Sequence, residues 1–481
     1  MRQLLSACHH VMCRHSVYAM IGCLALIIGI GFASTHIALL YVFGGIGIIF
    51  LFIVLLYSPW YGVVLLAFFL PFERLGSYDI AQVTVRPSQI VALCTMLALP
   101  VYFLKKRTVQ IPHNPIFIPL GCFFIAAILG VLHAPNIQRS FFVLLFIIFT
   151  CGISILLPFL ILTKKQIEQL LFFLYISFGI VTIFGVYQFI GDWIGLPPAV
   201  TGLRELYTKE ILGFPRVQST ALEPLYFANY LLVPLSILLS LFMGRVHFFK
   251  PSVFAVLIGL GVLNVVLTVA RGGYIAFFVS ACILLLYYFF QLQLFTWRNV
   301  GYAAAAGILG LIVLFQVVSF DKVIRQFTGH VSLSGILSGA SYNERVEMFQ
   351  VAENAWREHP IVGIGPGSFG PYEAEHPYIM PDHGWRIVNN EYIELLAENG
   401  LIGLLSLLVL FGIVILRSIK ALLQTKDRFI HAVLLGVLAG FIGILIQYNT
   451  FSILYIVHIW FTIGLLIAIQ NYILYPKHIH E

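Results

Sequence analysis

The chain has 481 residues, of which 60% are hydrophobic and only 10% are charged, with a net charge of +7. Soluble domains carry about 25% charged residues, so a water-soluble globular domain is excluded. The apolar stretches are continuous rather than alternating, which excludes a transmembrane β-barrel and leaves a bundle of membrane-spanning helices. The positive charge does not require a nucleic-acid partner, because membrane proteins collect Lys and Arg on their cytoplasmic side.

Apolar segments follow one another along the chain, and we predict about 12–14 transmembrane helices of about 20 residues each. The approximate segments are 16–34, 36–57, 60–72, 88–104, 115–133, 138–162, 167–190, 224–243, 252–270, 272–291, 299–318, 392–416, 429–446 and 450–474. The first is interpreted as a retained helix, because no clear small-residue cleavage site follows it. The third is short and could be re-entrant. The predicted fold class is therefore an all-α polytopic membrane protein.

The charges between these segments predict one orientation, with both termini in the cytoplasm and an even number of spans. The clusters that then fall on the cytoplasmic side, as the positive-inside rule requires, are Lys105-Lys106-Arg107, Lys164-Lys165, Arg245 with Lys250, Arg298, and the basic residues from Arg417 to Arg428. The same orientation places three less regular stretches outside, at residues 73–87, 195–223 and 319–391. Long polar loops in a compact protein are usually functional or disordered.

The loop at 319–391 contains a predicted helix and a glycine string. Residues 341–356 place apolar side chains at helical spacing, which predicts an amphipathic helix near the membrane surface; these are Val346, Phe349, Ala352 and Trp356. Residues 363–367 read Gly-Ile-Gly-Pro-Gly. Such amides could bind an anion, but no phosphate-loop lysine accompanies them, and a tight turn is the favoured interpretation.

Histidines and acids later in the same loop invite a metal interpretation, which we do not adopt. His376, Asp382 and His383 match no helical ligand spacing, and no metal or other cofactor is predicted. His383 is kept as a candidate general base, because imidazole titrates near neutrality.

Two arginines flank the mouths of helices on the predicted outer side. Arg216 precedes the span at 224–243, and Arg271 lies between two apolar runs beside Gly272-Gly273. Each could lack a binding role, with Arg216 a solvated loop charge and Arg271 an anchor at the membrane interface. Together they are typical of a phosphate or diphosphate clamp, because the planar guanidinium suits phosphate oxygens. Asn229, inside the following span, is predicted to make a cross-helix hydrogen bond.

The stretch VNNEYIELLAENGLIGLL opens the span at 392–416 with three acids on one helix face, Glu391, Glu394 and Glu398. Capping by Asn389 or Asn390 and the helix dipole explain part of this pattern. A general base that faces a cavity explains more of it, which makes Glu391 and Glu394 catalytic candidates.

Four stretches in this order resemble the O-antigen ligase and O-antigen polymerase superfamily of bacterial envelope proteins. They are RVQSTALEPLYFANYLL, LTVARGGYIAF, NERVEMFQVAENAWREHPIVGIGPGSFG and NNEYIELLAENGLIGLL, and together they cover roughly residues 216–405. The resemblance implies a C-type glycosyltransferase-like fold that is inverting, metal-independent and free of cofactors. It also implies N-terminal transmembrane helices over 1–200 and a ligase-like region over 201–480, with a periplasmic loop at 319–391.

The resemblance further implies the substrates and the site. The donor is a glycan on a polyprenyl diphosphate in membrane lipid, and the acceptor is a hydroxyl of a glycan or of the lipid A core, at the outer face of the inner membrane. The implied diphosphate-binding residues are Arg216 and Arg271, and Arg345, Asn389 and Asn390 are further substrate-binding candidates. The family's histidine usually directly precedes the Asn or Ser that opens the last external helix. Asn389 stands there in this chain, so the base is sought among His383, Glu391 and Glu394.

Two other classes of function were weighed. A transporter or flippase of lipid-linked glycan would use the same arginines without chemistry, but transporters often show inverted repeats, and none is evident. A receptor or scaffold whose loop binds a partner leaves the two arginines unexplained. The sequence does not distinguish a ligase from a polymerase.

Overall fold

The computed structural model describes residues 37–74, 78–80, 83–106, 111–246, 248–292, 340–381, 384–452 and 454–475. The predicted segments 16–34 and 299–318, the part of the large loop before residue 340, and His383 lie outside the described residues. The chain divides into two compact units, Met1–Leu65 with Gln89–Val109, and Leu66–Ser88 with Gln110–Glu481. The domain boundary expected near residue 200 stays a prediction.

The first unit includes α2 (Ile37–Tyr57), the first part of α3 (Trp60–Phe69) and most of α4 (Pro87–Lys106). Gly62 on α3 lies directly against the Thr95 side chain of α4, so these two helices pack closely. Close approach of this kind is typical of helix pairs in membranes, where small residues replace the hydrophobic driving force that water supplies.

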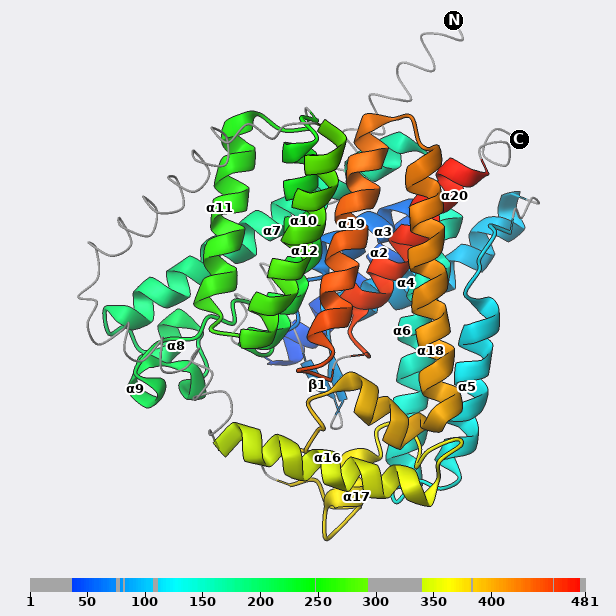
Figure 1. Ribbon diagram of the computed structural model, residues 1–481, viewed down its shortest axis with the longest axis vertical. Helices are drawn as coiled ribbons and strands as arrows, with labels where there is room; N and C mark the ends of the chain where they lie inside the picture. Colours follow the sequence, from blue (N-terminus) through cyan, green and yellow to red (C-terminus); the bar gives the residue numbers. More distant parts are fainter. Residues whose placement is uncertain are drawn as a thin grey trace, which may run out of the picture. The chain divides into compact units, whose positions relative to one another are not determined.

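The second unit contains the remaining elements (Figure 1). Its long helices are α5 (Phe117–Val131), α6 (Ile137–Leu160), α7 (Lys164–Trp193), α10 (Pro224–Met243), α11 (Pro251–Leu267), α12 (Arg271–Leu292), α18 (Glu391–Gln424), α19 (Arg428–Gln447) and α20 (Val457–Leu474). Its short elements are the antiparallel hairpin of β1 (Tyr78–Ile80) and β2 (Val83–Val85), α8 (Pro198–Thr201), η1 (Glu205–Tyr207), α9 (Lys209–Leu212), α16 (Ala340–Glu358) and α17 (Phe369–Glu373).

Every predicted apolar segment that falls within the described residues is a helix. Eight of these helices are long and apolar enough to cross a membrane, and four shorter apolar helices accompany them. The predicted all-α polytopic class is therefore confirmed, and the chain is a multi-pass membrane protein. The physical reason is that a helix pairs all of its backbone polar groups internally, which lipid requires.

The centre of the second unit is the contact between α10 and α19, which lie side by side (Figure 1). Gly436 and Gly440, one turn apart on α19, face the backbone of α10 at Ile237 and Val233, so the two helices touch backbone to backbone. Ser240 on α10 also donates to the carbonyl oxygen of Ala432, at 2.7 Å. Small residues and a buried hydroxyl thus fix the register of this pair.

The predicted amphipathic helix of the large loop is α16, which packs against α17 and α18. The helix is confirmed. Of the predicted apolar face, Ala352 is buried and Phe349 packs against the same cluster, whereas Val346 is 37% exposed; Met348 and Ala355 complete the packing. Their partners on the neighbouring segments are Ile364, Phe369, Val388 and Ala397.

Helix α18 is broken at Gly400, whose φ of 63° and ψ of −167° are not helical, and the bend is visible in Figure 1. The loop before α17 fills the break. The amides of Leu401 and Ile402 donate to the carbonyl oxygens of Pro360 and Ile361, at 3.0 and 3.1 Å. In return, the amides of residues 364 and 365 donate to the carbonyl oxygens of residues 397 and 398, at 3.0 and 2.8 Å. The backbone groups freed by the break are therefore paired across two segments.

We expect Gly400→Ala to destabilise the protein, because a Cβ there would overlap the carbonyl group of Ile361 and the backbone conformation is one that only glycine adopts easily. Strain of this kind costs about 1–3 kcal/mol, so the melting temperature of the full chain in detergent falls. Gly412→Ala on the same helix is the matched control, since nothing lies within 4 Å of its added methyl group. Equal melting of the two variants would contradict the strained break.

Candidate functional site

The structure places Arg216 against the segment that leads to Arg271. Arg216 is held by its backbone, whose N–H donates to Tyr207 O at 2.9 Å, and its guanidinium lies over the Tyr207 ring and donates through Nε to Thr268 O at 3.4 Å. Thr268 is three residues before Arg271, the first residue of α12. Burial lowers the pKa of Arg216, the nearby Tyr207, Tyr274 and Glu223 oppose that shift, and the charge of Arg271 makes a smaller contribution in the lowering direction. The charges of the two arginines therefore act on each other.

A carboxylate borders these arginines. Glu223 directly precedes α10, and its charge interacts with Arg216 and with Arg204. Burial raises the pKa of Glu223, and both arginines oppose that rise. The region therefore holds an excess of cationic groups at partly buried positions, which is the arrangement that attracts an anion.

The first residues of α12 and of α18 contact the same loop, the one between α19 and α20. Gly272, next to Arg271, lies against the side chain of Thr450 in the loop between α19 and α20. In that loop the carbonyl oxygen of Asn449 accepts from Asn390 Nδ2 at 3.3 Å, and that of Tyr448 accepts from the amide of Glu391 at 2.8 Å. Residues that the sequence places far apart therefore share one end of the second unit.

Asn390 is the helix cap, one of the two predicted alternatives. Its Oδ1 accepts from the amides of Tyr392 and Ile393, at 3.1 and 3.2 Å, which satisfies two of the free amides at the start of α18. Asn389 is half-buried with a left-handed φ of 58°, which asparagine tolerates, and its Nδ2 makes a long contact of 3.5 Å to Ile387 O. The side chain of Asn389 is therefore the less engaged of the pair.

The three acids of α18 are buried and hold neighbouring loops. Glu391 accepts from the amide of Leu454 at 3.0 Å, and Glu394 accepts from the amide of Val388 at 2.9 Å. Their exposed fractions are 3% and 9%, and that of Glu398 is 2%. Each carboxylate thus ties an external segment to the first turns of the helix.

Glu398 explains the glycine string. Its two oxygens accept from the amides of Gly367 and Phe369, at 2.8 and 3.0 Å, and one also accepts from Tyr455 Oη at 3.1 Å. Gly363, Gly365 and Gly367 all have positive φ, so the string is the tight turn that the sequence favoured. The amides of the turn do bind an acidic group, and that group is the carboxyl of Glu398 in the chain itself.

Arg139 belongs to this network and was missed from the sequence. Its Nε donates to Gly367 O at 3.0 Å, its guanidinium lies 5.4 Å from the centre of the Trp385 ring, and its charge interacts with Glu398. The signal that could have found it is the same one that singled out Arg271, an arginine at the outer end of an apolar run.

A second missed group is a buried acid and a buried histidine. Glu73 follows α3, and His458 is the second residue of α20. Their side chains face each other, with 3.9 Å between His458 Nδ1 and Glu73 Oε1. A lone histidine in an apolar run and an acid at the end of a short segment carry little signal in the sequence.

The other predicted residues occupy separate places. Arg345 is half-buried in the first half of α16, and His376 is exposed. Among the residues that the structure describes, no group of three or more His, Cys, Asp and Glu side chains is placed to hold a metal ion. His383 and Asp382 fall outside that part of the chain.

Four aromatic side chains of the large loop could stack on sugar rings: Trp356, Tyr372, Tyr378 and Trp385. Trp385 is packed against Arg139 and Gly370, and Trp356 donates to Pro360 O at 3.1 Å. The Oη of Tyr372 donates to Glu358. Tyr378, which is 69% exposed, is the most accessible of the four.

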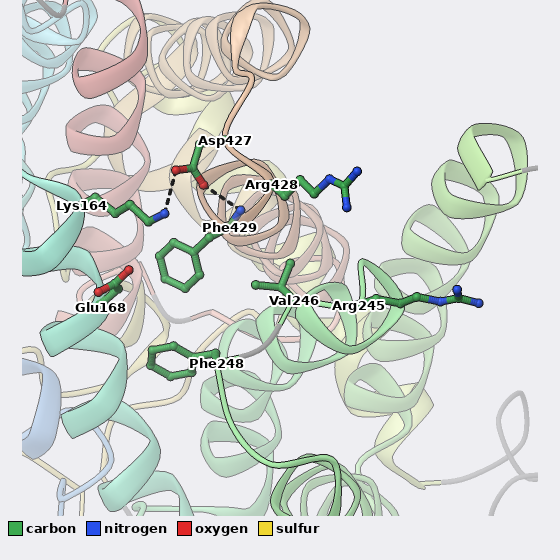
Figure 2. Close-up of a pocket in the computed structure, with 8 residues that line it drawn as sticks. All are labelled: Lys164, Glu168, Arg245, Val246, Phe248, Asp427, Arg428 and Phe429. Atoms are coloured by element: carbon green, nitrogen blue, oxygen red, sulfur yellow. Dashed lines mark hydrogen bonds and ion pairs between the residues drawn. The ribbon is translucent and has the colours of Figure 1, made fainter.

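A cavity of about 740 Å³ lies at the opposite end of these helices, where α7 and α19 begin and α10 ends (Figure 2). Lys164 Nζ contacts Asp427 Oδ2 at 2.7 Å there, while the side chains of Arg245 and Arg428 point away from this pair (Figure 2). Burial alone would raise the pKa of Asp427, but the hydrogen bond from Lys164 and two backbone amides lower it. This cavity adjoins the basic clusters predicted to be cytoplasmic and contains none of the predicted site residues.

We expect Glu398→Ala to free the turn at 363–369, because two buried amides lose their acceptor and each costs about 1–3 kcal/mol when left unpaired. Hydrogen exchange of the full chain in detergent should then accelerate at Gly367 and Phe369. Glu353→Ala is the control, since that exposed acid pairs only with Arg357 one turn away on α16. Unchanged protection of the turn in Glu398→Ala would contradict this role.

Comparison with known protein families supports the resemblance found in the sequence. Residues 254–408 match the family described as O-antigen ligase, a range that includes Arg271, Arg345 and the three acids of α18. No curated protein matches the chain. The family match supports glycan transfer of the O-antigen ligase or polymerase type, in general terms, by a glycosyltransferase-like enzyme. The match over residues 254–408 thus supports a place for this membrane protein in the O-antigen ligase and polymerase superfamily.

Proposed function

We propose that the protein transfers, or polymerises, a glycan carried on a polyprenyl diphosphate onto an acceptor hydroxyl at the outer face of the bacterial inner membrane. The observation that supports this most directly is that Arg216 donates to the carbonyl oxygen of Thr268, three residues before Arg271, so that both arginines belong to one end of the helices. Two like charges that share a partly buried place are unfavourable alone, and an anion between them offsets the repulsion. A diphosphate is an anion of suitable charge and geometry for two guanidinium groups.

In this proposal the reaction is a single displacement at the anomeric carbon. The acceptor oxygen forms a bond to that carbon while the bond to the diphosphate oxygen breaks, and the configuration inverts. The leaving diphosphate takes the electron pair, and the guanidinium groups of Arg216 and Arg271 stabilise the charge that develops on it. These two residues supply the positive charge, so the proposed step is metal-independent.

We assign the general base to His383, with Glu391 and Glu394 as the alternatives. Both carboxylates are more than nine-tenths buried and already accept backbone amides, of Leu454 and of Val388. This engagement suits them to holding the loops around the site. An imidazole of ordinary pKa is suited to taking the acceptor proton at neutral pH.

The remaining polar residues are proposed to contact the glycan or the acceptor. Asn389 has the less engaged amide at the start of α18, and Asn390 adds its amide to the same edge while it caps the helix. Arg345 on α16 and the exposed ring of Tyr378 would meet a hydrated glycan on the loop side. Aromatic rings suit the apolar faces of sugars.

We expect Arg216→Ala and Arg271→Ala each to lower the transfer rate by about 10²–10³-fold, the usual loss when one group that stabilises a developing negative charge is removed. The assay uses purified full chain in detergent with a lipid-linked glycan donor, and products are separated on gels. Arg357→Ala is the matched control, since that arginine is exposed on α16 and pairs with Glu353. Transfer at the normal rate by a folded Arg271→Ala protein would remove the clamp, and absence of transfer by the unaltered protein would favour a transporter.

We expect His383→Ala to lower kcat by about 10²–10⁴-fold, the range for loss of a general base, without changing the melting temperature. Glu391→Gln and Glu394→Gln keep the shape of the side chain and an oxygen acceptor, so they should lower kcat much less. The three variants are compared at saturating donor. A large loss in Glu391→Gln or Glu394→Gln with full activity in His383→Ala would move the base to α18.

A further inference from the structure

A chain of buried polar side chains connects four segments of the second unit and has no part in the mechanism proposed above. It runs from Glu73, after α3, to His458 on α20, Asn229 on α10 and Gln447 at the end of α19. All four side chains belong to residues that are at most 5% exposed. Asn229 therefore makes the predicted cross-helix hydrogen bond, and it does so within a larger network.

The direction of each hydrogen bond in this chain can be derived from one fixed end. Gln447 Nε2 donates to Leu225 O at 3.2 Å, so Gln447 Oε1 faces Asn229 and accepts from its Nδ2 at 3.0 Å. Asn229 Oδ1 is then left facing His458 Nε2, at 2.6 Å. An amide oxygen only accepts, so Nε2 carries a hydrogen.

The other ring nitrogen faces an acid. With a hydrogen on Nε2, the neutral imidazole has a lone pair on Nδ1, and Nδ1 lies 3.9 Å from Glu73 Oε1. Nδ1 has no hydrogen-bond partner among the described residues. An ionised carboxylate would therefore present a lone pair to a lone pair in a buried place, which is unfavourable. A single proton on either atom removes this conflict.

Among the described residues, the groups near the pair include a buried tyrosine, Tyr226, on which the charge of Glu73 acts. Arg86 is the cation that acts on Glu73, the backbone amide of Leu222 donates to the carboxyl group, and the Tyr230 ring meets the His458 ring edge-on with 6.1 Å between centres. Burial raises the pKa of Glu73, with Arg86 and the Leu222 amide opposing the rise.

We propose that Glu73 and His458 together hold one proton, carried either by Glu73 Oε1 or by His458 Nδ1, and that this proton makes them positioning residues for the arginine site. The inference depends on the proposed function only in taking Arg216 and Arg271 as the residues that are positioned. The tie itself is structural, because the Arg74 amide donates to Thr220 O at 2.9 Å and Thr220 Oγ1 donates to Pro71 O at 2.6 Å. The segment that carries Glu73 is thereby joined to the segment that runs from Arg216 to α10.

The other end of the polar chain reaches the second arginine. Gln447 ends α19, and its carbonyl oxygen accepts from the amide and from Oγ1 of Thr450, at 2.8 and 2.9 Å. Thr450 lies against Gly272, next to Arg271. The shared proton thus links the segment before α10, which carries Arg216, to the loop that supports Arg271.

Loss of this proton sets the direction in which stability changes with pH. When rising pH removes the proton, the two lone pairs face each other, and the contact between the segments that carry Glu73 and His458 is weakened. Stability from this source is present at low pH and is lost as pH rises, as expected for a buried acid whose pKa is raised by folding. Glu73→Gln removes the dependence, because an amide N–H can donate to Nδ1 at every pH.

The first test compares melting temperatures of the full chain in detergent from about pH 6 to about pH 9. We expect the unaltered protein to lose more thermal stability with rising pH than Glu73→Gln does. Glu168→Gln, the same chemical change at the opposite end of the helices, should follow the unaltered protein. Parallel curves for Glu73→Gln and the unaltered protein would overturn the proposal.

The second test reads the ring directly, by ¹⁵N NMR of histidine-labelled full chain with His458→Gln for assignment. The expected result is a hydrogen on Nε2 at every pH and an Nδ1 signal that shifts as the proton leaves. A neutral ring with its hydrogen on Nδ1 would overturn the proposal. In the transfer assay, kcat should fall with rising pH more steeply in the unaltered protein than in Glu73→Gln. Melting and NMR need no glycan donor, so they stay decisive even if Arg216→Ala and Arg271→Ala leave transfer unchanged.

Discussion

Backbone amides and carbonyl groups must be paired wherever water is scarce, and the interruption of α18 at Gly400 shows what that requirement produces. The break frees backbone groups on both sides of residue 400, and the loop at 359–365 supplies their partners. Because this loop has to follow the break closely, its glycines adopt positive φ and its amides converge on one carboxylate, that of Glu398. The conformation of this loop is thus set by the interruption of α18 at Gly400.

The acidic and the basic residues at this end of the second unit have different surroundings. The acids of α18 are buried and hydrogen-bonded to backbone amides, so they stabilise loops. Arg216 and Arg271 lie at the same end, and their charges act on each other. A region that holds two arginines beside acids whose carboxyl groups are taken up by backbone amides is suited to an anionic ligand.

The sequence predicted the helices well and the contacts between distant segments poorly, for physical reasons. Lipid demands long apolar helices, so continuous hydropathy alone located every described span. Arg216 and Arg271 could be associated because each stands at a helix mouth on the same predicted side. The pairing of residues 359–365 with the break in α18 could not be foreseen, because it depends on a tertiary contact between segments about forty residues apart. The acids of α18 were expected to face a cavity, since a one-dimensional pattern shows a shared face but not what covers it.

The backbone-to-backbone contact of α10 with α19 has a mechanical consequence. Two helices that touch through Gly436 and Gly440, with no flexible side chains between them, slide or separate only by losing the whole seam. They therefore behave as one rigid body. One end of this helix pair lies near the arginine site and the other near the Lys164–Asp427 pair, so the distance between these two places stays fixed. If the proposed function holds, we expect the loops at the ends of α10 and α19, rather than this helix pair, to rearrange when a glycan binds.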